Sequence, residues 1–260
     1  MALLIEAETR LEAWLRGTEH LLAKGADLNL ILSINRPGSD GNRGRAARDL
    51  VDELLVAEDV QTTHTVAETI FPAWQYRRRG LHGLRLYAEE EYPRLKRNDA
   101  RRWGTYAYRI IERVDSSGTV HRPLELLIEK MRGASAPGGG HFHSCYELDI
   151  AGPAYDIATY HGSTDERRRR GGPCLSHLSF KLHGNQVHLT AIYRSHDYRH
   201  KVVGNLLGLA RLQACVAREV GIAVGSLVIH STYAYLPTGR RKNRLVDLLN
   251  TIRDLPEESR

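Results

Sequence analysis

Residues 176–235 carry the pattern that most constrains how this chain folds. Apolar and polar side chains alternate along 176–182 and 186–193, on either side of a His-Gly-Asn turn, which predicts a β-hairpin. Residues 202–216 carry apolar side chains at helical spacing, and Gly221 is typical of a helix end. Alternation resumes at 224–235 as a further strand. A hairpin, a helix and a returning strand favour the α/β (α+β) class.

The first half of the sequence gives weaker signals. Residues 28–34 (LNLILSI) predict a buried strand, and helices are predicted for 45–56 and 124–131. Residues 64–72 predict either another helix or a short apolar segment that Pro72 ends. The opening MALLIEAETRLEAWLRG mixes charged and apolar residues and is interpreted as an amphipathic helix. The glycine-rich stretch 133–140 is expected to be a loop. With 260 residues, 42% of them hydrophobic, we predict one domain spanning residues 1–260.

Composition and charge indicate the compartment and the kind of partner. Three cysteines without CxxC spacing indicate reduced thiols and a cytoplasmic protein, and no stretch is long and apolar enough to span a membrane. The formal net charge of +6 favours an anionic partner. Basic residues cluster at 35–48, 77–79, 101–102, 167–170 and 240–242, runs that are usually solvated loops. Because the common nucleic-acid-binding motifs are missing, we do not expect a nucleic-acid partner.

The segment GGPCLSHLSF places Cys174 directly after a proline, at the start of the predicted hairpin. A lone cysteine is most often a small buried hydrophobe. Antiparallel pairing, however, brings Arg194, at the end of the second strand, to the same sheet edge. A guanidinium beside a thiol favours the thiolate and lowers the thiol pKa. Ser195 and Asp197 add a hydroxyl and a carboxylate there.

The spacing of these residues resembles a known family. Pro173-Cys174, then Arg194-Ser195-x-Asp197 starting twenty residues after the cysteine, then Asn205 eight residues after Asp197, resemble the motifs of the folate-dependent thymidylate synthase and pyrimidine-nucleotide hydroxymethylase superfamily. The family's H-x-Y strand resembles residues 233–235. Here Tyr233 stands where histidine is usual and Tyr235 matches the tyrosine. The resemblance covers about residues 173–236.

The resemblance implies a thymidylate-synthase-like fold, with a mixed β-sheet and surrounding helices, and a homodimer. It implies C5 methylation or hydroxymethylation of a pyrimidine nucleoside monophosphate, with 5,10-methylenetetrahydrofolate as cofactor. The choice between a methyl and a hydroxymethyl product stays open, because it depends on water in the closed site.

The same resemblance assigns roles to the residues at the sheet edge. Cys174 is the nucleophile that adds to C6 of the base, and Arg194 contacts both the thiolate and the phosphate. Ser195 binds phosphate, Asp197 helps to position base and folate, and Tyr235 bonds the sugar. Two of these residues have structural alternatives: Asp197 as a cap of the following helix, and Tyr235 as a half-buried strand aromatic.

Asn205 bears on the choice of base. Its amide can accept from N3–H of uracil and donate to O4, whereas cytosine presents the opposite polarity. In the superfamily an aspartate at this position accompanies cytidylate enzymes, so Asn205 favours a uracil nucleotide. Tyr233, in place of histidine near the 3′ hydroxyl, leaves the choice between ribose and deoxyribose open.

The first half matches the family less closely. Glu68 lies 36 residues before Gly104, a spacing that makes Glu68 the candidate for the family's water-organising glutamate; the alternative is an ordinary exposed helix residue. The paired arginines expected before the cysteine are absent. Residues 167–170, four arginines, either replace them or form a solvated loop. His141 and His143 are spaced like a metal-binding fragment but lack further ligands, and the C-terminal stretch looks helical rather than like an apolar closing tail.

Two other functions are compatible with parts of the sequence. A non-catalytic nucleotide- or RNA-binding relative of the fold fits the basic runs, but the combination of Cys174 with Arg194 argues against it. A flavin-dependent uridylate methylase is disfavoured because the glycine-rich dinucleotide fingerprint is absent.

Overall fold

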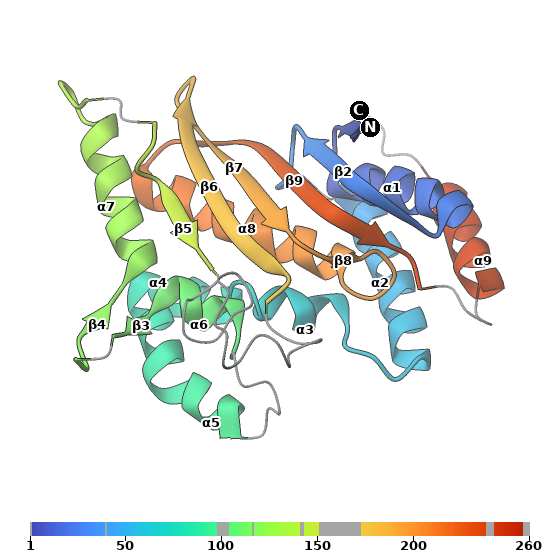
Figure 1. The fold of residues 1–260 in the computed structure, drawn as a ribbon, viewed down its shortest axis with the longest axis horizontal. Helices are drawn as coiled ribbons and strands as arrows, with labels where there is room; N and C mark the ends of the chain where they lie inside the picture. The colour runs from blue at the N-terminus through green and yellow to red at the C-terminus, as the bar shows by residue number, and fades with distance from the viewer. Residues whose placement is uncertain are drawn as a thin grey trace, which may run out of the picture.

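The computed structural model describes residues 2–39, 41–97, 104–115, 117–140, 143–150, 173–237 and 242–256. A mixed β-sheet flanked by helices dominates this part of the chain (Figure 1), which confirms the α+β class. The strands of this sheet are β1 Leu3–Ala7, β2 Ala26–Ile34, β5 Glu147–Asp149, β6 Leu175–His183, β7 Gln186–Tyr193, β8 His196–Asp197 and β9 Ala223–Tyr235.

The sheet has the strand order β1-β2-β9-β7-β6-β5. β6 and β7 form the predicted antiparallel hairpin, and β7 then pairs in parallel with β9. Parallel neighbours need a crossover connection, and the long helix α8 Val202–Val220 supplies it. The two-residue strand β8 pairs with the end of β9, so the segment between β7 and α8 lies against the sheet edge.

The remaining elements surround the sheet. They are α1 Arg10–Lys24, α2 Gly41–Ala57, α3 Thr63–Glu68, α4 Ala73–Leu86, the π-helix η1 Tyr87–Glu91, α5 Tyr92–Arg97, α6 Tyr106–Ile111, the small hairpin β3 Arg113–Val114 and β4 Val120–His121, α7 Pro123–Ser135 and α9 Lys242–Arg253. In Figure 1, α8 lies behind the strands and the other face of the sheet is turned toward the viewer. None of the described helices is long and apolar enough to cross a membrane.

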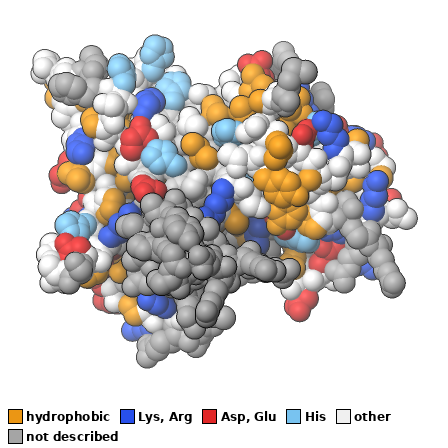
Figure 2. All heavy atoms as spheres, viewed as in Figure 1, with side chains coloured by type: hydrophobic (Ala, Val, Ile, Leu, Met, Phe, Trp, Pro, Cys, Tyr) orange, Lys and Arg blue, Asp and Glu red, His pale blue; other side chains and the backbone are white. Residues whose placement is uncertain are grey.

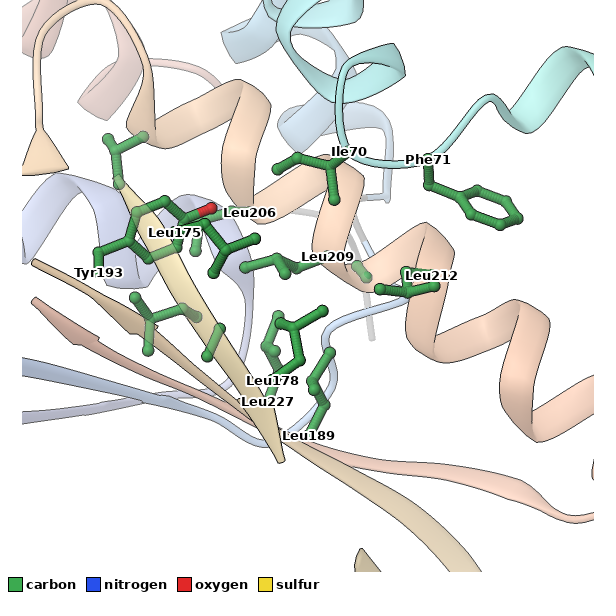
Figure 3. Close-up of a cluster of buried hydrophobic side chains, with 14 of the residues drawn as sticks. Ile70, Phe71, Leu175, Leu178, Leu189, Tyr193, Leu206, Leu209, Leu212 and Leu227 are labelled. Atoms are coloured by element: carbon green, nitrogen blue, oxygen red, sulfur yellow. The ribbon is translucent and has the colours of Figure 1, made fainter. Parts of the chain in front are cut away.

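The core lies between the sheet and α8. Leu178, Leu189 and Leu227 point from β6, β7 and β9 toward Leu209 and Leu212 of the helix (Figure 3), and all five side chains are almost fully buried. Period-two alternation on the strands and a wide apolar stripe on α8 make this layer. The arrangement holds the C-terminal end of β7 and the N-terminal end of α8 in fixed positions.

The helix α3 packs closely on α8 through two glycines. A Cβ added at Gly204 would lie 2.5 Å from the Val66 Cβ and 2.7 Å from the Thr63 carbonyl oxygen, and one added at Gly208 would be similarly crowded. The glycines therefore set the distance between the two helices.

We expect Gly204→Ala to lower the free energy of unfolding by about 1–3 kcal/mol, because overpacking outweighs the better helix propensity of alanine. Gly133→Ala on α7 is the matched control: nothing lies within 4 Å of its added Cβ, and a gain of up to about 1 kcal/mol is expected. Urea unfolding of both variants checks this. Equal stability of the two variants would contradict the close packing.

The predicted hairpin, the helix from residue 202, the strand 224–235 and the C-terminal helix are confirmed. Gly221 ends α8 in the left-handed conformation, with φ of 84°. The N-terminal helix prediction is wrong in its first part: residues 3–7 form β1, paired in parallel with β2, and Thr9 caps a helix that begins at Arg10. A short apolar run fits either element, and here pairing with β2 decides.

Candidate active site

A pocket of about 250 Å³ opens where the ends of the strands meet the N-terminal end of α8. Its lining residues are Gln61, Val66, Thr69, Tyr106, Cys174, Ser195, His196, Asp197, Lys201, Asn205 and Tyr235. Five residues predicted from the sequence therefore share one cavity although they come from separate elements. Three others, Arg194, Tyr233 and Glu68, are not part of this lining.

Cys174 immediately precedes β6, and backbone hydrogen bonds fix its position. The Arg194 N–H donates to the Cys174 carbonyl oxygen at 2.9 Å, as the hairpin predicts. The Cys174 N–H donates to the Tyr106 hydroxyl oxygen at 3.0 Å. Cys174 is exposed at the pocket, whereas Cys215 is buried in α8. The buried-core interpretation thus describes Cys215 and not Cys174.

The environment of the Cys174 thiol sets its acidity. Burial by surrounding protein raises the pKa of Cys174, the nearby Arg194 guanidinium lowers it, and Asp197 raises it further, so that the net pKa lies above the ordinary value. Arg194 acts in the predicted direction, but the expectation of a lowered thiol pKa is wrong. Although part of the cysteine surface is exposed at the pocket, the protein around the thiol displaces much of the water that would solvate a thiolate, and this effect outweighs the single cation.

The pH dependence of Cys174 alkylation tests this balance. Only the thiolate reacts with iodoacetamide. We therefore expect the alkylation rate of Cys174 to increase with pH, with its midpoint at a higher pH than that of an ordinary cysteine. Arg194→Gln removes the lowering charge and should slow the reaction at pH 8, and Asp197→Asn should speed it, each by up to about tenfold, or one pKa unit. Peptide mass spectrometry separates Cys174 from the exposed Cys145. A faster reaction in Arg194→Gln would contradict the assignment.

Arg194 lies at the end of β7 beside the pocket. Among the residues the structure describes, its guanidinium has no hydrogen-bond partner, while its charge acts on Cys174 and Tyr106. A guanidinium close enough to act on the pocket-lining Cys174 is suited to binding an anion such as phosphate.

Asp197 caps the turn that leads into α8. Its Oδ1 accepts from the backbone N–H groups of Arg199 and His200, at 2.9 and 3.0 Å, and its Oδ2 lies 2.8 Å from His200 Nδ1. Burial raises the pKa of Asp197, but hydrogen bonds from His200 and Arg199 outweigh it, and the net pKa is lowered. The capping alternative therefore describes one role of Asp197, while its ionised carboxylate also lines the pocket.

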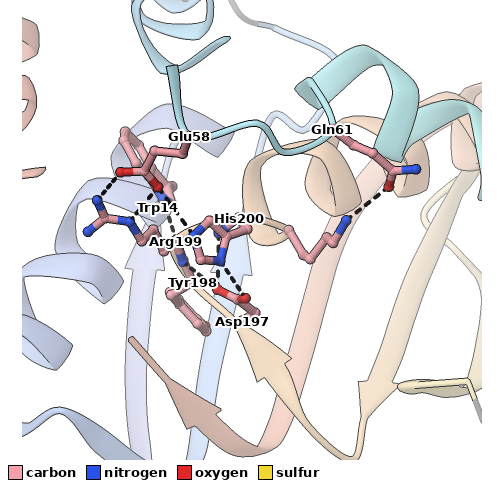
Figure 4. A network of polar contacts seen from close by, with 8 residues as sticks. Trp14, Glu58, Gln61, Asp197, Tyr198, Arg199 and His200 are labelled. Carbon is pink, nitrogen blue, oxygen red and sulfur yellow. Dashed lines mark hydrogen bonds and ion pairs between the residues drawn. The ribbon is translucent and has the colours of Figure 1, made fainter. Parts of the chain in front are cut away.

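A polar network behind this turn holds it in place (Figure 4). The Arg199 guanidinium donates through Nε to the Glu58 carboxylate at 3.0 Å and makes a second contact through Nη2. His200 Nε2 lies 3.4 Å from the same carboxylate. Both partners of the Arg199–Glu58 pair are 2% exposed, so breaking it would leave a buried charge unpaired. On the pocket side, Lys201 Nζ donates to Gln61 Oε1 at 3.0 Å.

Asn205 lies in the first turns of α8, 5% exposed. Its amide nitrogen lies 3.0 Å from His196 Nε2, and both residues line the pocket. His196 occupies the unspecified position between Ser195 and Asp197, so the motif spacing gave no reason to select it. Tyr106 was also missed, because its contact with Cys174 joins residues 68 positions apart.

The two tyrosines of β9 differ in their positions. Tyr235 lines the pocket, and burial raises the pKa of its hydroxyl to about 12, so it stays protonated at neutral pH. Tyr233 is 43% exposed and stacks on Tyr235, with ring centroids 5.7 Å apart. Tyr233 thus supports Tyr235 from outside the pocket lining.

Glu68 ends α3 next to Thr69, a lining residue, but its own carboxylate accepts from Arg211 Nη1 at 3.1 Å. Glu68 is not among the residues that line the pocket with Cys174. The four arginines at 167–170 and His141 lie outside the described residues. Within the described ranges no group of three or more His, Cys, Asp or Glu side chains is arranged to hold a metal ion.

Comparisons with known proteins place the chain near one group of relatives. No family model matches it. A protein of Methanococcoides burtonii named "Putative thymidylate synthase" is 27% identical over 233 residues, 90% of this chain and 88% of that protein. A protein of the same name from Methanosarcina mazei is 26% identical over the same shares. One from Methanothermobacter thermautotrophicus is 41% identical over 64 residues, 25% of this chain. The chain is thus similar, along most of its length, to divergent thymidylate-synthase-like proteins of archaea.

Proposed function

We propose that this protein transfers a one-carbon unit to C5 of a pyrimidine nucleoside 5′-monophosphate, with Cys174 as the covalent nucleophile. The observation that carries the proposal is the presence of Cys174, Ser195, Asp197 and Asn205 in the lining of one pocket, with the Arg194 charge acting on the thiol. The similarity to proteins named thymidylate synthases supports it.

C5 of a pyrimidine is a weak nucleophile, and a thiolate overcomes this by adding to C6. The S–C6 bond forms, the C5–C6 π electrons move onto C5 and O4, and the resulting enolate attacks an electrophilic carbon. Loss of the C5 proton and release of the carrier nitrogen from the transferred carbon leave a methylene group at C5. Addition of a hydride or of water to that carbon, with elimination of the thiolate from C6, then restores the aromatic base with a methyl or a hydroxymethyl group. Because the pKa of Cys174 is raised, its proton must leave before the attack, and the open pocket gives it a route to solvent.

The remaining residues bind and orient the nucleotide. Arg194 and Ser195 hold the phosphate, and the protonated Tyr235 hydroxyl bonds a sugar hydroxyl, with Tyr233 stacked behind it. Asn205 pairs with the edge of the base. Glu68 stays a prediction of the sequence, because its carboxylate pairs with Arg211.

The pocket wall also suits the cofactor that the resemblance implies. Asp197, Lys201 and Gln61 offer an ionised carboxylate, an ammonium and an amide, the donors and acceptors that a pterin ring requires. When bound, 5,10-methylenetetrahydrofolate would supply the one-carbon unit as an electrophilic carbon and, for a methyl product, the hydride that reduces it.

Tritium release tests the reaction. The protein is incubated with UMP, dUMP, CMP and dCMP labelled at C5, with and without 5,10-methylenetetrahydrofolate. We expect tritium in water from the uracil nucleotides, increased by the cofactor. No release from any of the four nucleotides would reject the proposed function.

A homodimer through the open face of the sheet is part of the proposal. Ile31, Ile192 and Val228 lie on neighbouring strands and are half-buried on the face away from α8. Figure 2 shows hydrophobic and histidine side chains exposed on this side of the molecule. A second copy would cover this face, as a closed twofold assembly requires.

Light scattering checks the dimer. We expect twice the 29.3 kDa chain mass for the native protein and the single-chain mass for Val228→Arg, which places a charge in the centre of the face. Leu126→Arg, at an exposed position of α7, is the control and should stay dimeric. A monomeric native protein would reject this part of the proposal.

A further inference from the structure

His196 is a buried side chain of the pocket lining that neighbouring residues hold on several sides. It is 1% exposed, and its ring stacks on Tyr193, with centroids 4.0 Å apart and planes 2° from parallel. Its Nε2 lies 3.0 Å from Asn205 Nδ2, and its Nδ1 lies 2.9 Å from Ser231 Oγ. Contacts from β7, α8 and β9 therefore fix both the ring plane and the two nitrogen atoms.

The structure places the Asn205 amide nitrogen, and not its oxygen, against His196 Nε2, and this placement sets the direction of the hydrogen bonds. The NH₂ group of Asn205 can only donate, so His196 Nε2 accepts and carries no proton. The ring proton then sits on Nδ1 and donates to the Ser231 hydroxyl oxygen. Burial lowers the pKa of His196 to about 3, although Asp197 opposes the shift, and the ring is neutral at physiological pH.

The amide orientation in the structure and an unprotonated Nε2 are consistent with each other, because Asn205 Nδ2 lies against His196 Nε2. Rotating the amide by 180° would place its oxygen against the Nε2 lone pair and cost a buried hydrogen bond. In the orientation held, Asn205 retains Oδ1 as an acceptor and one N–H as a donor for a ligand. This is the pattern complementary to N3–H and O4 of uracil, and opposite to N3 and the N4 amine of cytosine.

We propose that His196 is a positioning residue that, anchored by Ser231, fixes the Asn205 amide in the orientation that selects uracil over cytosine. The inference rests on the proposed function for the identity of the ligand. Asn205 makes the contact with the base, and His196 acts through it. The expected discrimination is about tenfold to hundredfold, because the wrong base leaves buried polar groups unpaired.

The test compares binding of UMP and CMP by calorimetry in four variants. His196→Leu removes the acceptor and frees the amide, so we expect the ratio of the two Kd values to fall by tenfold or more. His196→Gln retains an acceptor at the same distance along the side chain and should restore most of the preference. Ser231→Ala removes the anchor of the ring proton and should act in the same direction as His196→Leu.

The fourth variant, Gln213→Leu, is the matched control. Gln213 is a fully buried polar residue of α8 that donates to the Val187 carbonyl oxygen at 2.7 Å, and it is not among the pocket-lining residues. We expect its loss to lower stability but leave the Kd ratio unchanged. A merely structural role of His196 would have the same effect, so an unchanged ratio in His196→Leu overturns the inference.

A second readout does not depend on the ligand. Nitrogen-15 NMR of the histidine rings should show His196 with its proton on Nδ1 and no titration between pH 5 and 8, whereas a proton on Nε2 overturns the inference. If the native protein binds neither nucleotide, the proposed function fails and the base-selecting role is rejected with it. Binding of both nucleotides with an Nε2–H tautomer rejects the inference alone.

Discussion

Cys174→Ala is expected to abolish tritium release from C5 of a labelled uracil nucleotide, a loss of at least about a thousandfold, because a thiolate is a far stronger nucleophile toward C6 than the hydroxyl, imidazole and ammonium groups that also line the pocket. The thiol faces the pocket beside Arg194, and its backbone is held by Tyr106 and by the hairpin partner. Removing the sulfur atom leaves the binding residues in place, so nucleotide binding should persist while exchange stops.

The other two cysteines provide the controls for that experiment. Cys145→Ala and Cys215→Ala should retain most of the exchange, since neither residue lines the pocket. Cys215 is 1% exposed, so its replacement is expected to lower stability rather than turnover. Full exchange by Cys174→Ala protein would rule out covalent catalysis by this residue.

Asn205→Asp is expected to move the preference from uracil toward cytosine, changing the ratio of kcat/KM values by about tenfold to hundredfold. A carboxyl group in place of the amide can accept from the N4 amine of cytosine and no longer donates to O4 of uracil. The change also reverses the contact with His196, whose Nε2 now faces an acceptor and must carry the proton itself.

Turnover of the four labelled nucleotides measures this ratio. Asn250→Asp, the same substitution at an exposed position of α9, is the control and should leave the ratio unchanged. An Asn205→Asp enzyme that still prefers uracil by the native margin would show that Asn205 does not read the base.

Local patterns predicted the elements that form the pocket. Alternation along 176–193 gave the hairpin, and the hairpin brought Arg194 next to Cys174, because antiparallel pairing follows from the turn alone. The apolar stripe of α8 and the alternation along β9 predicted a helix followed by a strand. Asn205 lies on that helix and Tyr235 at the end of that strand, and both line the pocket. In each case the side-chain pattern that predicts the element lies within the element itself.

Contacts between residues far apart in the chain could not be predicted from local sequence patterns. Pairing with β2 makes β1 a strand, and no nearby residue signals it. The Glu58–Arg199 ion pair joins residues 141 positions apart in the chain. The hydrogen bond between the Cys174 backbone and the Tyr106 hydroxyl joins residues 68 positions apart. The raised pKa of Cys174 could not be predicted for the same reason. The motif contains the arginine that lowers this pKa, but the burial that raises it depends on the whole fold.

The central claim is a covalent bond between Cys174 and C6 of a pyrimidine nucleotide, and mass spectrometry of a trapped adduct tests it most directly. In a 5-fluorouracil nucleotide, fluorine replaces the hydrogen that must leave C5 as a proton. Because fluorine cannot leave in this way, the adduct formed with 5,10-methylenetetrahydrofolate should persist. We predict that the peptide containing Cys174 gains the mass of nucleotide plus cofactor. An unmodified Cys174 peptide, or an adduct on Cys145 or Cys215 instead, would contradict the account.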